Sequence, residues 1–262
     1  MTTIRHTTTD RHELETFLCD YAATLLECGA TTVRIEKNVL RMAEAYGSET
    51  EVNIYPRHVE VVVKGKAAGS IIVRSKATCL CAVNYHTVKS LSKLSLHCRE
   101  RHLPLGTAIM LYRKVTGTPR IPFPAVTALT SLANASFCRL FGGDGMAMLI
   151  VLVATACGFY VKDALHRKWH IDPRLSIIAA SCISAVMSCS ARVFSWSGTP
   201  DTALATSVLY LVPGIHYMNA VSDLINGHHI CAMSRFITAS TTTICLSAGL
   251  YLCLLIMNIN IM

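Results

Sequence analysis

The feature that most constrains this chain is a series of five long apolar segments that begins after residue 120. Their polar side chains are mostly Ser, Thr and Cys, which helix bundles in membranes accept. Each segment is close to the ~20 residues that an α-helix needs to cross the ~30 Å hydrocarbon core of a bilayer. The sequence therefore predicts an α-helical membrane domain at 121–262 with five transmembrane helices. They run over about residues 123–141, 145–162, 174–195, 202–222 and 236–257.

Charged residues are concentrated before this apolar part. Residues 1–120 carry 17 of the 24 Lys and Arg residues and 11 of the 16 Asp and Glu residues. Only 15% of the whole chain is charged, against about 25% in an average soluble domain. Acidic and basic residues are interspersed in the polar part, with no long basic run, so the net charge of +8 does not indicate nucleic-acid binding. We infer a polar domain at 1–120 in front of the membrane domain.

The polar domain has the sequence pattern of a small α+β fold. Residues 11–46 show two amphipathic helical patterns, which end at Gly29 and Gly47. Residues 51–75 are rich in Val and Ile and contain turn formers, which predicts two or three antiparallel strands. Residues 84–117 then predict two further helices.

The N-terminal stretch and the basic loops predict the orientation in the membrane. Residues 1–15 are hydrophilic and lack the apolar core of a signal peptide, so we expect the polar domain in the cytoplasm. Lys and Arg concentrate in cytoplasmic loops, and the loops after the second and fourth apolar segments carry most of them in this half. Both observations give the same orientation, with five spans and the C-terminus outside. These basic residues are Lys162, Arg167, Lys168, Arg174 and Arg235, against Arg139 and Arg192 on the other side.

The sequence shows no pattern for a metal, a cofactor or an enzyme. Twelve cysteines are present, but Cys79 and Cys81 form a C-x-C pair with no second pair at zinc spacing. The stretch FGGDG lacks the GK[ST] ending of a nucleotide-binding loop, so ATP-driven transport is not indicated. Cys28 and Glu36 lie in the polar half, without a recognisable nucleophile, base and orienting group. We expect a protein that is not an enzyme, with no metal and no cofactor.

The fourth apolar segment carries the candidate transport residues. Pro213 and Gly214 interrupt it, and a broken helix frees backbone groups that can bind a substrate inside a membrane. Asn219 and Asp223 follow four residues apart, so they share one helix face. Arg235 can pair with Asp223 or with a substrate carboxylate. The alternatives are a plain kink, an interfacial carboxylate and a basic anchor at the cytoplasmic surface.

Two turns on the predicted outer side complete the set of candidates. Thr199 and Pro200 open the fourth segment, where we expect Thr199 to contribute to substrate binding. Gly142, Gly143 and Asp144 form a tight turn between the first two segments, and Asp144 is expected to cap the following helix.

These motifs together resemble the YjjP branch of the ThrE (threonine/serine exporter) family over nearly the whole chain. The strongest part reads S-x-TP, SVLYLVPG and NAVSDLINGH, followed by Arg235. Weaker support comes from LLECGA with Glu36 downstream, from VNYHTV and from the FGG-x-G turn.

The resemblance implies a bacterial inner-membrane secondary exporter of small carboxylates. In the split branch of the family, the larger protein acts with a small membrane subunit of the YjjB type, which we expect as the partner. A dicarboxylate such as succinate is the favoured substrate, and threonine or serine is the alternative. A membrane scaffold or regulator is a further alternative, and self-association into a homo-oligomer stays open.

Overall fold

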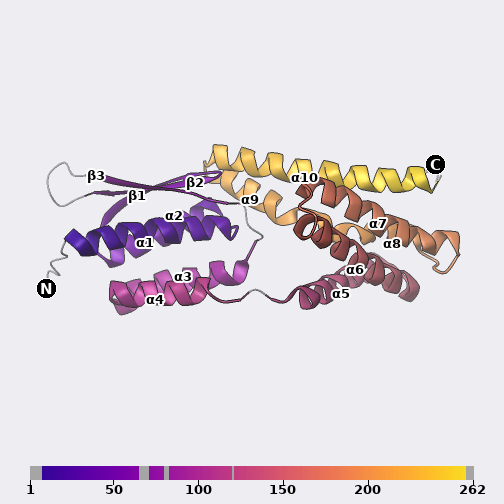
Figure 1. The fold of residues 1–262 in the computed structure, drawn as a ribbon, viewed down its shortest axis with the longest axis horizontal. Coiled ribbons are helices and arrows are strands. Elements are labelled where there is room, and N and C mark those ends of the chain that lie inside the picture. The colour runs from indigo at the N-terminus through magenta and orange to yellow at the C-terminus, as the bar shows by residue number, and fades with distance from the viewer. Residues whose placement is uncertain (1–7, 65–70, 80–82, 120, 258–262) are drawn as a thin grey trace. The chain divides into compact units, whose positions relative to one another are not determined.

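The structure is a computed structural model that describes residues 8–64, 71–79, 83–119 and 121–257 (Figure 1). It contains two compact units that interleave along the chain. The first unit comprises Met1–Pro119 and Tyr217–Phe236, and the second comprises Arg120–His216 and Ile237–Met262. The first unit therefore also contains a segment of the predicted membrane domain.

The first unit consists of helices and a three-stranded antiparallel sheet in the order β1-β2-β3. The predicted elements of the polar half, two helices, a strand meander and two further helices, are all present. Their bounds are α1 Thr8–Glu27, α2 Thr32–Ala45, β1 Glu49–Tyr55, β2 His58–Lys64, β3 Ile71–Ala77, α3 Tyr85–Arg101 and α4 Leu105–Thr116.

The core of this unit lies between the sheet and the first two helices and continues on to α3 and α4. Figure 1 shows α1 and α2 against the sheet, with α3 and α4 on the other side of these helices. Alternate residues of β2 are buried toward the helices, as the period of two in a strand requires: Val59, Val61 and Val63. Burial of each of these Val side chains stabilises the folded state by about 1.5–3 kcal/mol.

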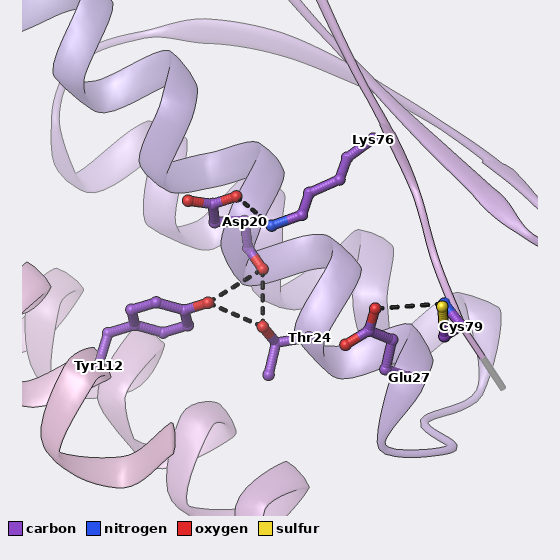
Figure 2. Close-up of polar contacts among 6 residues, drawn as sticks. All are labelled: Asp20, Thr24, Glu27, Lys76, Cys79 and Tyr112. Atoms are coloured by element: carbon purple, nitrogen blue, oxygen red, sulfur yellow. Dashed lines mark hydrogen bonds and ion pairs between the residues drawn. The ribbon is translucent and has the colours of Figure 1, made fainter. Parts of the chain in front are cut away.

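Polar side chains of α1 fasten this helix to the sheet and to α4. The Asp20 carboxylate pairs with the Lys76 ammonium of β3 at 2.5 Å. The Thr24 and Tyr112 hydroxyls are 2.7 Å apart, which ties α1 to α4. Figure 2 shows these contacts among Asp20, Thr24, Glu27, Lys76, Cys79 and Tyr112.

The second unit is helical throughout its described part. Its elements are α5 Phe123–Leu140, α6 Gly145–Arg167, α7 Pro173–Val193, α8 Pro200–Ser207 and the 3₁₀ helix η1 Leu209–Leu211. Two further helices have residues in both units: α9 Gly214–Ile225 and α10 His229–Ile256.

Three of these helices are long and apolar enough to cross a membrane: α6, α7 and α10. They correspond to the predicted spans at 145–162, 174–195 and 236–257. Helix α6 continues to Arg167, so Lys162 lies inside a helix and not in the loop where the sequence placed it. The C-terminal residues 258–262, expected on the outer side, lie outside the described residues.

The predicted span at 202–222 is not one continuous helix. It consists of α8, the 3₁₀ helix η1 and the first part of α9. The α-helix is interrupted from Val208 to Pro213. Bonds of the i→i+3 type replace the α-helical ladder, from the Leu211 N–H to the Val208 carbonyl at 3.0 Å and from the Val212 N–H to the Leu209 carbonyl at 3.1 Å. Pro213 has no N–H to restore the ladder, so the helix restarts only at Gly214.

Small residues allow close packing in the second unit. A Cβ built on Gly158 of α6 would lie 3.1 Å from the Ala180 carbonyl oxygen of α7, and closer still to two hydroxyls. Backbones approach in this way at interfaces of small residues, as in packed membrane helices.

Candidate functional site

Asn219 and Asp223 of α9 are buried and lie in the first unit. Asn219 is 6% exposed and Asp223 is fully buried. The sequence placed both on one helix face, and the structure shows that this face meets the turn between α1 and α2. The partner of the polar face is therefore a protein loop within the same compact unit.

Asp223 caps the N-terminus of α2 from a distant part of the chain. Its Oδ1 accepts a hydrogen bond from the backbone N–H of Thr32, the first residue of α2, at 3.1 Å. The N-cap residue itself, Thr31, makes no side-chain cap. A carboxylate at this end of a helix is stabilised by free N–H groups and by the helix dipole.

Arg235 of α10 supplies the countercharge. Its Nη1 lies 3.1 Å from Oδ2 of Asp223, and its Nη2 donates to the Ala30 carbonyl at 2.8 Å. The Asn219 Nδ2 donates to the Gly29 carbonyl at 3.0 Å. Three side chains from the segment 217–236 thus bind both ends of one turn. We refer to these residues as the loop cluster: Gly29, Ala30, Thr32, Asn219, Asp223 and Arg235.

Gly29 gives the loop cluster its shape. The Gly29 and Ala30 N–H groups donate to the carbonyls of Leu26 and Leu25, both at 3.0 Å, which ends α1 in a Schellman motif. Gly29 has φ +83°, and a Cβ there would lie 2.9 Å from a methyl of Val83. The predicted helix-ending role of Gly29 is confirmed, and its carbonyl is turned toward Asn219.

Two further contacts join the segment 217–236 to the first unit. His228 Nε2 lies 3.6 Å from the Glu36 carboxylate of α2. The Cys231 thiol donates to the Ile54 carbonyl of β1 at 3.3 Å. Sequence reasoning noted Glu36 as part of a family pattern but did not pair it, because its partner is far away in the chain.

The second unit holds a separate polar group, where two turns meet. The Asp144 carboxylate accepts the Ala147 N–H at 2.6 Å, the Ser197 hydroxyl at 2.9 Å and the Gly198 N–H at 2.7 Å. The Asp144 N–H donates to the Thr199 hydroxyl at 3.0 Å. We call Asp144, Ser197, Gly198 and Thr199 the turn clasp. The predicted capping role of Asp144 is confirmed, and Thr199 is one of its partners.

The hydrogen bonds of the turn clasp favour the charged form of Asp144. Those from the Ala147 and Gly198 N–H groups are the main cause that lowers the pKa of Asp144 below its usual value. Gly142 and Gly143 complete the turn: Gly142 has φ +85°, and a Cβ on Gly143 would lie 2.8 Å from the Cys138 carbonyl oxygen. Pro200 follows Thr199 as the first residue of α8.

The interior of the second unit contains hydrogen-bonded side chains between helices. Asn134 of α5 donates to the Thr155 hydroxyl of α6 at 2.7 Å and to the Thr206 carbonyl of α8 at 3.0 Å. Next to Thr155 on α6, the Ala154 carbonyl accepts a hydrogen bond from the Ser184 hydroxyl of α7 at 3.1 Å, and this hydroxyl lies 3.0 Å from the Tyr210 hydroxyl. None of these residues was singled out from the sequence, since single hydroxyls in apolar helices carry no distinctive pattern.

The candidate residues thus fall into two groups. Asn219, Asp223 and Arg235 come together in the loop cluster, whereas Thr199, Pro200, Pro213 and Gly214 belong to the second unit. Across the part of the chain that the structure describes, no three His, Cys, Asp or Glu side chains are grouped to hold a metal ion.

Known proteins share the pattern of this chain. A model of the ThrE family, described as "Putative threonine/serine exporter", matches residues 16–257. The chain belongs to the ThrE family. The match includes the loop cluster, the turn clasp and the helix break, so it extends over both units. The family is one of membrane exporters.

Two relatives bear the name "Probable succinate transporter subunit YjjP". The protein of Klebsiella aerogenes is 26% identical over 228 residues, which is 86% of this chain and 86% of the relative. The protein of Escherichia coli K12 is 25% identical over 240 residues, which is 90% of this chain and 91% of the relative. No solved structure matches the chain.

Proposed function

We propose that this chain is the larger subunit of a split secondary exporter, which moves small carboxylates out of a bacterial cell together with a small membrane subunit of the YjjB type. The ThrE match over residues 16–257 carries this proposal. Three helices long enough to cross a membrane support it as well. The proposed cellular location is the inner membrane. The first 120 residues would lie in the cytoplasm, followed by five spans, with the C-terminus outside.

The proposed substrate is a dicarboxylate such as succinate. Both relatives are named as succinate transporter subunits at about one quarter identity, which favours this class. The family description names threonine and serine, so amino-acid export is the second candidate. Transport would follow alternating access without ATP, with a broken helix at the substrate site.

The structure suggests different parts for the two groups of residues. The backbone groups at Pro213–Gly214, with Thr199 on the preceding helix, are proposed to serve the substrate. Asp223 and Arg235 are proposed to couple the helix break to the α1–α2 turn, because α9 starts at the break and is bound at that turn. A conformational change in α9 would then also change the α1–α2 turn of the polar domain.

Proton coupling through Asp223 is a separate proposal that a single substitution tests. Asp223→Asn keeps the shape of the side chain but removes the titratable group. We expect the pH dependence of export to flatten in this variant; an unchanged pH profile would contradict proton coupling at Asp223.

Export of labelled substrate tests the proposed function directly. Cells or vesicles preloaded with labelled succinate or threonine would carry the chain alone, both subunits, or both subunits with Asp223→Asn. We expect efflux only with both subunits, and a slower but measurable efflux in Asp223→Asn. Asp201→Asn is the matched control, since the Asp201 side chain is 78% exposed. No efflux of either compound, with both subunits folded in the membrane, would favour the scaffold alternative.

A further inference from the structure

Lys162 is an ionisable residue inside α6, one of the helices long and apolar enough to span a membrane. It lies five residues before the helix ends at Arg167. A cation within such a helix is costly unless it faces protein or a wet cavity, so it is a candidate functional group. The direction in which Lys162 faces decides between a functional role and surface anchoring.

The spacing along α6 places Lys162 on the inner face of the helix. Thr155 and Gly158 precede it by seven and four residues, and positions at these steps share one face. Both are buried in the packing of the helices: Thr155 is bonded to Asn134, and Gly158 lies against the Tyr210 hydroxyl, which a Cβ on Gly158 would overlap. Lys162 continues this hydroxyl-lined face by one turn.

The Lys162 ammonium has no partner of its own among the described residues. The side chain is half-buried, and no carboxylate oxygen of the described chain lies within ion-pair distance of it. The neighbouring Asp163 is occupied by Arg167, whose Nε lies 2.6 Å from its Oδ1. Arg167 itself is 71% exposed. The anchoring role at the helix end therefore belongs to Arg167 and Lys168, both exposed, and Lys162 remains available for an anion.

The helix break reaches the same level of the second unit. Helix α8 and η1 run alongside α6 in the same direction: Thr199 bonds Asp144 at the start, and Tyr210 lies against Gly158 farther on. The Phe159 and Tyr210 rings are 6.2 Å apart. The next turn of α6 carries Lys162, and Pro213 and Gly214 follow η1 after Val212.

We propose that Lys162 binds a carboxylate of the transported substrate, on the face of α6 that is shared with the Tyr210 and Ser184 hydroxyls and level with the break at Pro213–Gly214. This inference rests on the proposed export function and adds a residue to it. The Lys162 cation would select a small carboxylate over a neutral solute of the same size.

Transport kinetics in vesicles test the assignment. The full chain and its small subunit would be assayed with labelled succinate for wild type, Lys162→Gln, Lys162→Arg and the exposed control Lys168→Gln. We expect Lys162→Gln to raise the half-saturating succinate concentration about tenfold or more, because a charged hydrogen bond is lost. Lys162→Arg should stay within about threefold of wild type, and Lys168→Gln should match wild type.

The outcomes separate the two proposals. Export by wild type with unchanged kinetics in Lys162→Gln would overturn the role of Lys162 and leave the exporter standing. Absence of wild-type export of succinate and of threonine would overturn the exporter itself. If Lys162→Gln does not reach the membrane, competition measurements on the wild type test the role of Lys162 instead. Succinamide, which is neutral, should compete at least about tenfold more weakly than succinate, and equal competition would exclude recognition by a cation.

Discussion

Asp144 and Asp223 are both carboxylates at the N-terminus of a helix, but they reach it in opposite ways. Asp144 caps α6 from the adjacent position in the chain, where it accepts the Ala147 N–H. Asp223 caps α2 from 191 residues away, and its second oxygen faces Arg235. The first arrangement follows from local geometry, whereas the second exists only because two distant segments pack together.

The same interaction, a carboxylate cap, therefore serves two purposes in this chain. A local cap defines where a helix begins and holds a turn. A cap that comes from another helix forms only when that helix is in its native position. Such a cap can therefore couple the capped helix to the helix that carries the carboxylate. Because Asp223 is fully buried, it also depends on Arg235 in a way that the more accessible Asp144 does not depend on any single cation.

Removal of one partner of the buried pair should have the largest effect. Asp223→Ala leaves Arg235 without its countercharge and the Thr32 N–H without its acceptor, so we expect a loss of about 3–5 kcal/mol in the free energy of unfolding. Chemical denaturation of the full chain in detergent measures it. The double variant Asp223→Leu with Arg235→Met should be closer to wild type than Asp223→Ala alone. Equal losses in both would show that the pair is not coupled, and the comparison with Asp144 would fail.

A smaller and local effect is expected at the turn clasp. Asp144→Ala removes the acceptor of the Ala147 and Gly198 N–H groups, so hydrogen exchange at these two amides should accelerate while the α1–α2 turn is unaffected. Amide exchange followed by mass spectrometry reads both regions in one experiment. Faster exchange at residues 29–32 in this variant would show that the clasp is not local.

The same carboxylate should show a defined pH dependence. The lowered pKa of Asp144 means that its contribution to stability is present above its usual value of 3.8 and is lost only as the pH falls through the lower folded-state value. Exchange at Gly198 should therefore stay slow down to about pH 4 in the wild type. Loss of protection well above that pH would contradict the lowered pKa.

The smallest effect is expected at an exposed ion pair of the first unit. Lys76 and Asp20 are 46% and 39% exposed, so Lys76→Gln should cost at most about 1 kcal/mol. The hydrogen bond to Asp20 raises the pKa of Lys76, so the contribution is present below the usual value of 10.5 and fades as the pH rises through the folded value. Thermal melts of wild type and variant should converge at high pH. A loss of unfolding free energy as large as that of Asp223→Ala would show that burial does not explain the difference between the two ion pairs.

The sequence predicted the elements of the polar half because their signals are local. Gly29 and Gly47 end helices by adopting a positive φ, and both do so here. The Val-rich strands show a period of two that only a half-buried sheet satisfies. The cap at Asp144 was also predicted, since its partner is three residues away.

The roles of the fourth apolar segment could not be predicted in the same way. The sequence indicated a break at Pro213 and a shared face for Asn219 and Asp223, and both are present in α9 and the turn before it. It did not show that this face meets the α1–α2 turn, or that Lys162 belongs to the inner face of α6. Spacing along one helix defines a face but not what lies opposite.

From the amino-acid pattern alone we could predict the family, the division into a polar and an apolar half, the position of the helix break and the local caps. The folded chain was needed to show that Asp223, Arg235 and Asn219 bind Gly29, Ala30 and Thr32. It was also needed to show that Lys162 has no countercharge within ion-pair distance among the described residues. The two kinds of feature differ in the distance along the chain over which the responsible interactions act. Helix propensity, capping and hydrophobic periodicity act over a few residues, whereas a buried charge is satisfied by whichever distant group the packing brings within about 3 Å of it.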